Sequence, residues 1–584
     1  MDESSLLLHT QHPRKVGGLL LLGLCALLLF PFLGEMLYNT RGEPREAIVA
    51  VAMRESGNWI LPTNNGTDIA YKPPLFHWCV ALCSLFAGKV TEFASRVPSA
   101  LALSLIVWSV YAFYARRKGV GVAFLTGFLT LTNFEMHRSG THARVDMLVS
   151  AWMVLALLSL FEDRERGDRG LPLRSVLLLS AAFLTKGPVG LALPCLTAGV
   201  FRLLRGEGFG KVVARLAGIG IAACILPLCW YAAAYNQGGE RFLRLVMEEN
   251  FLRFLGKMTY ASHLNPWYYY FFTLLSGFLP YALLVVMSMC VLKYRRVRLG
   301  GGVCAWWGKL KGFVSRTDDV KLYSLLCVVV IFLFYSCLKS KRSVYIMPIY
   351  PFAAYFLAEY VRMLCKRHAG VVKSFGWVLA SLALVVTALF VVLRAGLLPD
   401  NLFASSKEPQ GAAFWLALRH SGLAWWKWVV VLLPALAAGC FICLRRKRTF
   451  VLGIGALVTA LLLALDGVYQ PVVLNVKSDK PLAAYIARKV PEGTIYSYRK
   501  DVTKGNPLHP FTINFYLGDR VVPFESALPG EGFLIVSGDS MEEFQKVFPS
   551  YAVELVKDFQ HRSCDDRKPV TFWHFKKVPP GNLP

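Results

Sequence analysis

The sequence predicts a polytopic α-helical membrane protein with a small α/β or α+β domain at its C-terminal end. Its mean hydropathy is +0.46, and 55% of its 584 residues are hydrophobic while 17% are charged. A soluble chain of this length carries more charge. Apolar runs recur along residues 1–469 at lengths that cross a bilayer, which is typical of helical spans.

The formal net charge of +27 would favour nucleic-acid binding in a soluble protein. Here the basic residues cluster between apolar runs, for example at residues 116–118, 293–296, 366–367 and 445–448. Such clusters are typical of cytoplasmic loops. We therefore expect no nucleic-acid partner and a chain embedded in the lipid bilayer.

The basic loops also predict the sidedness of the spans. With Arg14 and Lys15 in the cytoplasm, the first span is uncleaved and leads out near Tyr38. About thirteen spans then place every strong basic cluster inside except residues 339–342. The N-terminus is expected in the cytoplasm, and residues 470–584 are expected in the periplasm of a bacterial inner membrane.

The first outer loop, residues 39–94, is expected to lie at the membrane interface. Residues 43–56 have the spacing of an amphipathic helix that ends at Gly57. Residues 75–87 are apolar but short for a span, so we interpret them as interfacial or re-entrant.

Residues 470–584 are expected to form the soluble domain. Strand-like runs at 494–498, 532–536 and 570–573 alternate with helical runs at 480–489 and 540–548. Cys564 is the one cysteine in this part, which excludes a disulfide within it. The 14 cysteines show no zinc-finger spacing, so no metal ligand is assigned.

Charged side chains at the outer ends of the spans are the candidate site. Glu43 and Asp146 are the candidate catalytic carboxylates. Cations beside a membrane suit a phosphate ester whose tail lies in the bilayer. The candidate substrate-binding residues are Arg45, Lys72, Arg144, Lys186, His263, Lys341 and Arg342.

Each candidate also has a structural interpretation. Glu43 and Asp146 have positions that suit helix capping. Lys72 and Lys186 precede Pro or Gly-Pro, where lysines often extend to the interface. His263 fits a loop hydrogen bond better than a metal site. The cations at 339–342 are hardest to explain this way, because they lie outside against the positive-inside bias.

Several short motifs carry a family resemblance over roughly residues 15–360. They are Glu43-Pro44-Arg45-Glu46-Ala47, Lys72-Pro73-Pro74-Leu75, Ser95-Arg96-Val97-Pro98, Arg144-Val145-Asp146, Thr185-Lys186-Gly187-Pro188, Glu249-Asn250 and Lys341-Arg342-Ser343-Val344-Tyr345. In this order they resemble the lipid-carrier-dependent glycosyltransferases of the GT-C superfamily. The aminoarabinose transferase branch, related to protein O-mannosyltransferases, is the most similar.

The resemblance implies a GT-C enzyme that takes a sugar from undecaprenyl phosphate at the periplasmic face. It implies lipid A or a related envelope glycolipid as the acceptor, and it adds Tyr345 to the substrate-binding residues. That branch usually has Asp-Glu-x-Arg in the first outer loop, whereas Gly42 precedes Glu43 here. It often has an acidic residue before Lys-Pro-Pro, where this chain has Tyr71. No cofactor is assigned, and a divalent metal stays open.

Two other functions fit the composition. One is a transporter or flippase of polyprenyl-linked sugars, although the sequence has no internal repeat of the kind transporters show. The other is a transferase that acts on protein or polysaccharide. The transferase reading predicts cations that stabilise the leaving lipid phosphate during an oxocarbenium-like displacement.

Overall fold

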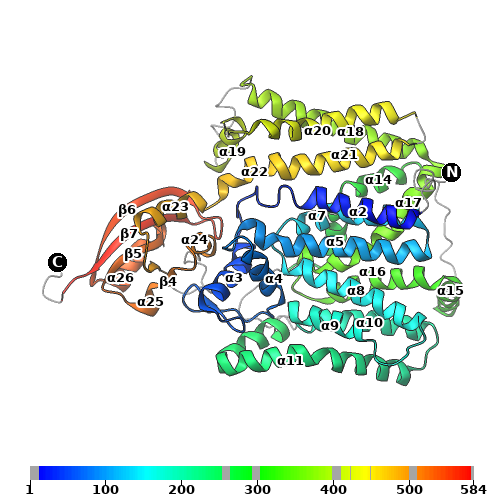
Figure 1. Cartoon of the computed structure of the whole chain (residues 1–584), viewed down its shortest axis with the longest axis horizontal. Helices are drawn as coiled ribbons and strands as arrows, with labels where there is room; N and C mark the ends of the chain where they lie inside the picture. The colour runs from blue at the N-terminus through cyan, green and yellow to red at the C-terminus, as the bar shows by residue number, and fades with distance from the viewer. Residues whose placement is uncertain are drawn as a thin grey trace.

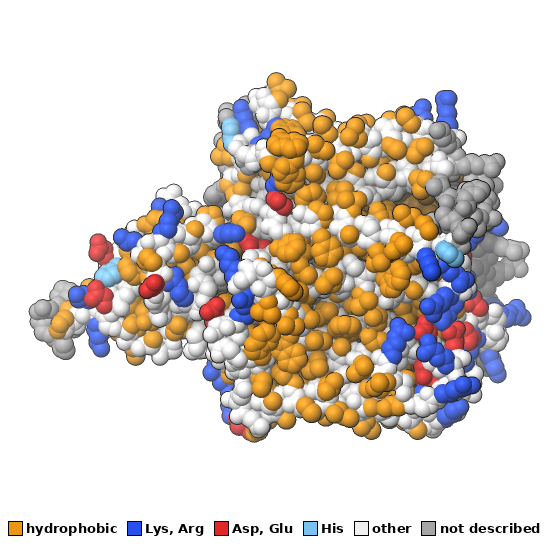
Figure 2. Space-filling view, viewed as in Figure 1, with side chains coloured by type: hydrophobic (Ala, Val, Ile, Leu, Met, Phe, Trp, Pro, Cys, Tyr) orange, Lys and Arg blue, Asp and Glu red, His pale blue; other side chains and the backbone are white. Residues whose placement is uncertain are grey.

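The structure is a computed structural model that describes residues 12–252, 264–292, 303–397, 409–420, 422–446, 449–498 and 510–579. A body of long helices carries a sheet domain at one end (Figure 1). Hydrophobic side chains cover the middle of the helical body, and Lys and Arg gather at the end where the N-terminus lies (Figure 2). This division matches a hydrocarbon layer with a basic edge.

The helices of the body follow the expected order of spans. Their bounds are α2 (Pro13–Leu29), α5 (Glu92–Arg117), α6 (Val120–Thr132), α7 (Phe134–Gly140), α8 (Val145–Glu165), α9 (Leu173–Lys186), α10 (Val189–Leu204), α11 (Phe209–Met247), α13 (Tyr269–Gly277), α14 (Tyr281–Met289), α15 (Val303–Arg316), α16 (Asp319–Cys337), α17 (Tyr350–Arg367), α18 (Ala369–Arg394), α19 (Pro409–His420), α20 (Trp425–Leu444) and α21 (Phe450–Ala464).

Within the described residues, eight helices are long and apolar enough to cross a membrane, or nine if the bent pair α13–α14 is one span. The first, third, fifth and sixth expected spans correspond to the shorter helices α2, α6, α9 and α10. The expected number of about thirteen spans therefore stays a prediction. Helix α11 continues beyond a break at Gly239 as far as Met247.

Helix starts follow local chemistry. The Thr91 side chain accepts a hydrogen bond from the Ala94 amide at 3.1 Å and caps α5. Asp318 caps α16 in the same way through the Lys321 amide at 3.1 Å. These caps fix where α5 and α16 begin, and α5 carries the arginine on which the candidate site is built.

The first outer loop folds as α3 (Pro44–Ser56), a hairpin of β1 (Thr63–Asn64) and β2 (Asp68–Ile69), and α4 (Leu75–Leu85). Gly57 ends α3 in the left-handed conformation at φ +69°, as expected. Every residue of Glu46–Met53 is buried, so α3 lacks the exposed polar face expected of an amphipathic helix, and its position at the membrane interface stays a prediction. Helix α3 packs between α4 and α24 of the sheet domain, so it has no free face.

The sheet domain confirms the expected α/β composition. Its sheet has the order β4-β3-β5-β7-β6, with β3 parallel to β4 and β5, and β7 antiparallel to β5 and β6. The elements are α23 (Lys480–Lys489), β3 (Ile495–Ser497), α24 (Phe511–Tyr516), β4 (Val521–Pro523), α25 (Phe524–Ala527), β5 (Glu531–Ser537), α26 (Met541–Val547), β6 (Tyr551–Arg562) and β7 (Pro569–Lys577).

A helical segment links α21 to the sheet domain. The chain leaves α21 through a π-helical turn (Leu465–Tyr469), α22 (Gln470–Leu474) and a 3₁₀ turn that ends at Lys477. An apolar helical run thus extends to Lys477, and the expected domain boundary at residue 470 stays a prediction.

Polar contacts attach the sheet domain to the first outer loop. The Asn65 amide donates to Asp519 at 2.8 Å, and Asn514 donates to the Asn65 side chain at 2.5 Å. At the other end of the loop, Lys480 and Tyr516 both donate to Glu92, at 2.9 and 3.0 Å. The domain thereby holds the loop at two points that follow α3.

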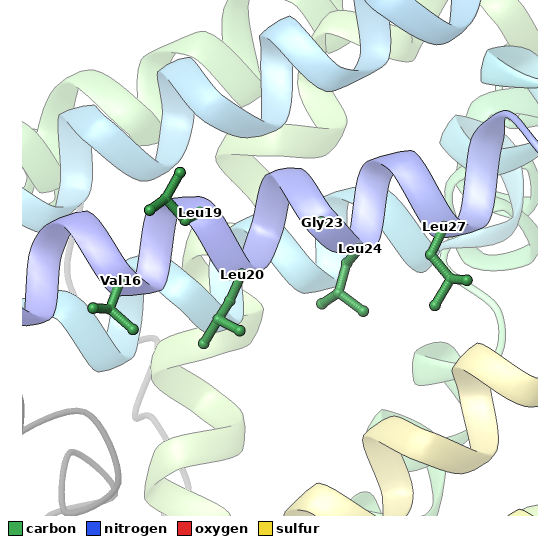
Figure 3. A pocket seen from close by; sticks show the side chains of 6 residues that line it. All are labelled: Val16, Leu19, Leu20, Gly23, Leu24 and Leu27. Atoms are coloured by element: carbon green, nitrogen blue, oxygen red, sulfur yellow. The ribbon is translucent and has the colours of Figure 1, made fainter.

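An apolar groove of about 410 Å³ runs along α2 (Figure 3). It is lined by Val16, Leu19, Leu20, Gly23, Leu24 and Leu27. None of these residues has a polar side chain, so the groove suits a lipid chain and offers no catalytic group.

Candidate active site

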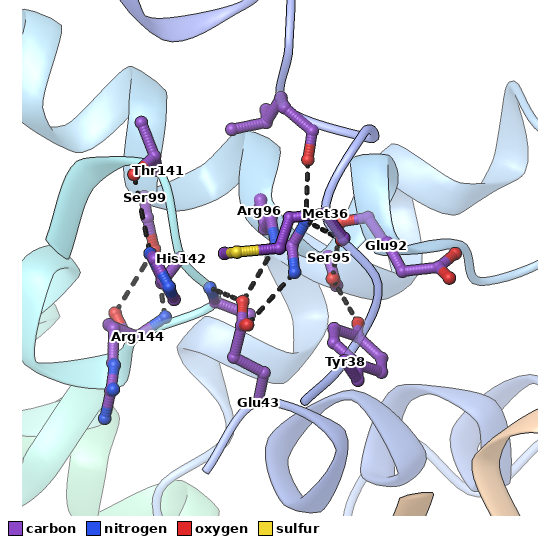
Figure 4. A network of polar contacts seen from close by, with 12 residues as sticks. Met36, Tyr38, Glu43, Glu92, Ser95, Arg96, Ser99, Thr141, His142 and Arg144 are labelled. Carbon is purple, nitrogen blue, oxygen red and sulfur yellow. Dashed lines mark hydrogen bonds and ion pairs between the residues drawn. The ribbon is translucent and has the colours of Figure 1, made fainter. Parts of the chain in front are cut away.

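Glu43 lies at the start of α3 and is buried against Arg96 of α5 (Figure 4). The guanidinium donates from Nε at 2.8 Å and from Nη2 at 3.0 Å, one to each carboxylate oxygen. The Ala143 amide adds a third bond at 2.8 Å. Arg96 Nη1 also donates to the carbonyls of Leu33 and Met36, at 2.8 and 2.6 Å. The pair ties α5 to the chain that links α2 with α3.

This environment keeps Glu43 ionised. Burial by itself would raise the pKa of Glu43, but the Arg96 guanidinium and the Ala143 amide lower it to about 2. A general base works best with a pKa near the working pH. The geometry therefore favours Glu43 as a charge-organising group rather than as a base.

A second cluster forms around Glu46, one turn further along α3. Glu46 accepts from Arg45 at 2.9 Å, from the Lys72 ammonium, and contacts His77 Nε2 at 3.1 Å. Burial would raise the pKa of Glu46, but Lys72 and Arg45 hold it well below its usual range. Glu249 also acts electrostatically on Lys72 and Arg45. The two candidate cations of this cluster are thus already balanced by carboxylates.

The third cluster lies where α8, α9 and the 3₁₀ turn Ser343–Ile349 meet. Asp146 forms an ion pair with Lys186 at the end of α9. The Lys186 ammonium also lies 4.3 Å from the centre of the Tyr345 ring, a cation–π distance. The structure thus brings together three residues that are 40 or more positions apart in the sequence.

Two arginines of this third cluster, Arg144 and Arg342, make no side-chain hydrogen bond or ion pair within the described parts of the chain. Both act electrostatically on Asp146, and Arg144 also lies within electrostatic range of Glu43. The two guanidiniums repel each other, and their unused donors suit an incoming anion.

The π-helical turn Glu248–Leu252 joins the second and third clusters. Glu249 acts on the Lys72 side, while Asn250 Oδ1 would lie 2.7 Å from a Cβ atom on Gly187. Gly187 has φ +94° and follows Lys186 directly. The glycine therefore allows this close approach and lets one short turn contact both clusters.

Lys341 is buried, and its ammonium group is bound by backbone carbonyls. Its ammonium donates to the carbonyl of Asn265 at 3.1 Å and to that of Leu338. These bonds attach the segment before α13 to the end of α16, which is a structural arrangement. His263, the remaining candidate, lies outside the described residues.

A group that could hold a metal lies elsewhere. Asp479, Cys564 and Asp565 of the sheet domain gather within 4.8 Å in the part of the chain that the structure describes. Asp479 accepts from Ser563 at 2.7 Å and Asp565 accepts from the Thr512 amide at 2.8 Å. Protein donors thus occupy both carboxylates, and the group is not part of the candidate site.

The chain is similar to known glycosyltransferases. The dolichyl-phosphate-mannose-protein mannosyltransferase family matches residues 71–231, and the Alg9-like mannosyltransferase family matches residues 250–409. A protein named undecaprenyl phosphate-alpha-4-amino-4-deoxy-L-arabinose arabinosyl transferase from Aeromonas hydrophila is 26% identical over 63% of this chain and 64% of its own length. One from Proteus mirabilis is 26% identical over 64% of this chain and 66% of its own length. The matched region thus spans just under two thirds of these relatives.

The fold comparison covers nearly the whole chain. A crystal structure of ArnT from Cupriavidus metallidurans bound to undecaprenyl phosphate superposes with a TM-score of 0.68 and 18% identity, over 97% of this chain and 98% of that one. The chain is thus similar to the aminoarabinose transferase branch of the GT-C superfamily, and it shares the fold of ArnT. The eight or nine apolar helices of its described residues are those of a multi-pass membrane protein.

The shared fold explains why the candidate residues meet. The first outer loop supplies Glu43 and Glu46, the start of α8 supplies Asp146, and the end of α9 supplies Lys186. Sequence reasoning left Arg96 and His77 out of the candidate site. Arg96 had a usable signal, because an arginine near the start of an apolar run needs a carboxylate partner.

Proposed function

We propose that this protein transfers a sugar from undecaprenyl phosphate to a phosphate group of lipid A or a related envelope glycolipid. The first candidate for the sugar is 4-amino-4-deoxy-L-arabinose, which the names of the similar transferases contain. The observation that carries the proposal is the group of buried ion pairs and unpaired arginines at one end of the spans. A protein that moves phosphate-linked lipids requires such cations at the membrane surface.

The proposal includes an orientation. The site lies at the end of the helical body that bears the sheet domain, whereas the N-terminus lies at the opposite, basic end (Figures 1 and 2). By the positive-inside rule the basic end is cytoplasmic. The site and the sheet domain then face the periplasm.

The residues divide into roles. Arg45 and Lys72 bind the donor phosphate, with Glu46 holding both cations in place. Lys186, fixed between Asp146 and Tyr345, faces the reacting groups and stabilises negative charge in the transition state. Glu43 holds the loop through Arg96 and transfers no proton. Among the candidates, Lys341 supports the fold near the site.

The direct test is mass spectrometry of lipid A and surface glycans from cells with and without this gene. The expected result is a sugar on a lipid A phosphate that appears with the wild-type gene. Asp146→Asn should lose the modification at normal protein level, because it removes the counter-ion of Lys186. Glu492→Gln, an exposed change in the sheet domain, is the matched control and should keep it.

A second arm uses purified protein in lipid nanodiscs with the undecaprenyl-linked sugar and lipid A. Transfer in this defined mixture supports the proposal. Movement of the donor across vesicle membranes without transfer would contradict it and favour a flippase. A glycosylated protein in place of lipid A would contradict the acceptor.

A further inference from the structure

Helix α15 lies at the end of the helical body that also holds the N-terminus (Figure 1). It belongs to the connection between α14 and α16, and residues 293–317 of this connection include seven Lys or Arg and no Asp or Glu. Basic runs next to a membrane span attract anionic lipid headgroups. Charge alone identifies such a run as a cytoplasmic loop, whereas the structure shows a helix with a defined exposed side.

The C-terminal end of α15 is held at the level where other helices of the body begin or end. Arg205, which follows α10, donates to the carbonyls of Val314 and Thr317 at 2.8 and 2.6 Å. It also pairs at 2.7 Å with Asp319, the first residue of the apolar helix α16. Because apolar spans end where the hydrocarbon layer ends, α15 lies at the level of the lipid headgroups.

One side of α15 packs on the helical body, and another side is exposed. Val314 packs against the hydrophobic core. Lys309, Phe313 and Arg316 are exposed, and their spacing of four and three residues puts them on one side of the helix. Phe313 is 49% exposed. Hydrocarbon disfavours the two cations and water disfavours the ring, whereas the membrane interface accommodates both.

The two carboxylates that follow α15 are bound by cations of other helices. Asp318 pairs at 2.7 Å with Lys118, which follows α5. Asp319 pairs at 3.0 and 2.7 Å with arginines of α8 and of the residue after α10. Within the part of the chain that the structure describes, the three basic residues of α15 make no ion pair. Their charge is therefore available to an anion from outside the protein.

We propose that α15 is an interfacial helix whose exposed side, formed by Lys309, Phe313 and Arg316, binds the headgroups of anionic phospholipids. The two cations contact lipid phosphates, and the ring of Phe313 enters the boundary between headgroups and acyl chains. In the proposed orientation this boundary belongs to the cytoplasmic leaflet, at the opposite end of the body from the candidate active site (Figure 1). Lipid binding at α15 does not depend on the proposed sugar transfer.

A lipid headgroup fits this side of α15 better than a free anion or an acidic protein does. Arg316 comes three residues before the first residue of α16, so the phosphates of the surrounding bilayer lie next to it. A free phosphate ion would leave the Phe313 ring in water. An acidic protein would compete with headgroups that the bilayer holds at high local concentration.

The test follows hydrogen exchange of residues 308–316 in the full-length protein in lipid nanodiscs. The nanodiscs contain phosphatidylcholine alone or mixed with phosphatidylglycerol, and both leaflets have the same composition, so the orientation of the protein does not affect the result. Each Lys or Arg near an anionic surface contributes about fivefold to binding. Phosphatidylglycerol should therefore slow exchange in the wild-type protein by roughly fivefold or more, and high salt should weaken this effect.

Three variants divide the effect between charge and ring. Lys309→Gln with Arg316→Gln removes both charges and should reduce the slowing to less than about twofold. Lys309→Arg with Arg316→Lys keeps both charges, so this matched control should exchange like the wild-type protein. Phe313→Ser keeps the cations and should lose part of the slowing. Equal melting temperatures in phosphatidylcholine nanodiscs check that all variants fold, and the wild-type comparison of the two lipids needs no variant.

Equal exchange of the wild-type helix in the two lipid mixtures would overturn the proposal. Unchanged slowing in Lys309→Gln with Arg316→Gln would also overturn it. If inorganic phosphate in phosphatidylcholine nanodiscs slows exchange as strongly as phosphatidylglycerol does, the ligand is a free anion. If poly-glutamate slows exchange and phosphatidylglycerol does not, the partner is an acidic protein, and in both cases the lipid assignment is wrong.

Discussion

Buried carboxylates in two regions of this molecule have pKa values that are shifted in opposite directions. In the first outer loop, Glu43 meets the Arg96 guanidinium, and its pKa falls to about 2 despite burial. In the sheet domain, burial raises the pKa of Asp519 to about 6 and that of Asp565 to about 7, because their donors are neutral amides and hydroxyls. Glu43 thus stays charged, whereas Asp519 and Asp565 of the attached domain lose their charge in mild acid.

The largest expected effect comes from breaking the Glu43–Arg96 pair. Both side chains are about 98% buried or more, so Glu43→Gln leaves a guanidinium without its counter-charge. Removing one partner of such a pair typically costs about 3–5 kcal/mol. We expect a lower melting temperature and less folded protein, measured by thermal unfolding in detergent with Glu492→Gln as the control.

The opposite outcome would revise the role of Glu43. If Glu43→Gln melts like the wild-type protein but loses sugar transfer, then Glu43 acts in the chemistry. The pH dependence of stability gives a second check. Since the folded pKa of Glu43 is depressed, its contribution is present above about pH 4.5 and is lost as the pH falls toward 2.

The second prediction concerns Asp146, a carboxylate with some solvent access. Its side chain is 13% exposed and forms an ion pair with Lys186, and Arg144 and Arg342 lie within electrostatic range. Asp146→Asn should therefore lower the rate of sugar transfer by about 10²-fold, as for a lost electrostatic contact in an active site. Thermal unfolding should change far less than in Glu43→Gln. A similar loss of stability in both variants would contradict this division.

Part of the fold could be predicted from the sequence. The spans, the helix 480–489 and the strands 532–536 and 570–573 were predictable, because hydrophobic periodicity decides them. The burial of α3 was not predictable, because α24, more than 450 residues later, covers it. The interfacial position of the first outer loop and the domain boundary at residue 470 stay predictions.

The charged residues of the candidate site could be predicted from the sequence, but their ion-pair partners could not. Glu43, Asp146 and Lys186 stood out as charges at span ends, but nothing local shows that Glu43 belongs to Arg96 and Lys186 to Asp146. Lys341 looked like a phosphate ligand because it breaks the positive-inside bias. Its use of two backbone carbonyls depends on the loop before α13, which only the tertiary structure brings there.

Lys341 gives the third prediction, since it is a buried cation that meets only neutral acceptors. Lys72→Met should raise the donor KM by roughly tenfold, the factor for about 1.4 kcal/mol of lost binding. Lys341→Met should leave the donor KM near its wild-type value and lower the melting temperature instead. Steady-state kinetics with varied donor separate the two lysines. A raised donor KM in Lys341→Met would return it to the phosphate site.

The smallest effect is expected at the contact between Asp519 and Asn65. The carboxylate faces Asn514 and the Asn65 amide, with the acidic Asp68 and Glu55 nearby and no cation acting on it. Because its folded pKa of about 6 exceeds the unfolded value, its stabilising contribution is full below about pH 4 and is lost as the pH rises through 6. The sheet domain should therefore hold the β1–β2 hairpin more tightly at pH 5 than at pH 7.5.

Hydrogen exchange of residues 63–69, corrected for the intrinsic rate, measures how tightly the hairpin is held. Asp519→Asn keeps the oxygen acceptor and removes the charge, so its protection should be high and equal at both pH values. A wild-type protein whose hairpin is equally protected at both pH values would show that Asp519 stays ionised, and the contrast between the two regions would then not hold at this contact.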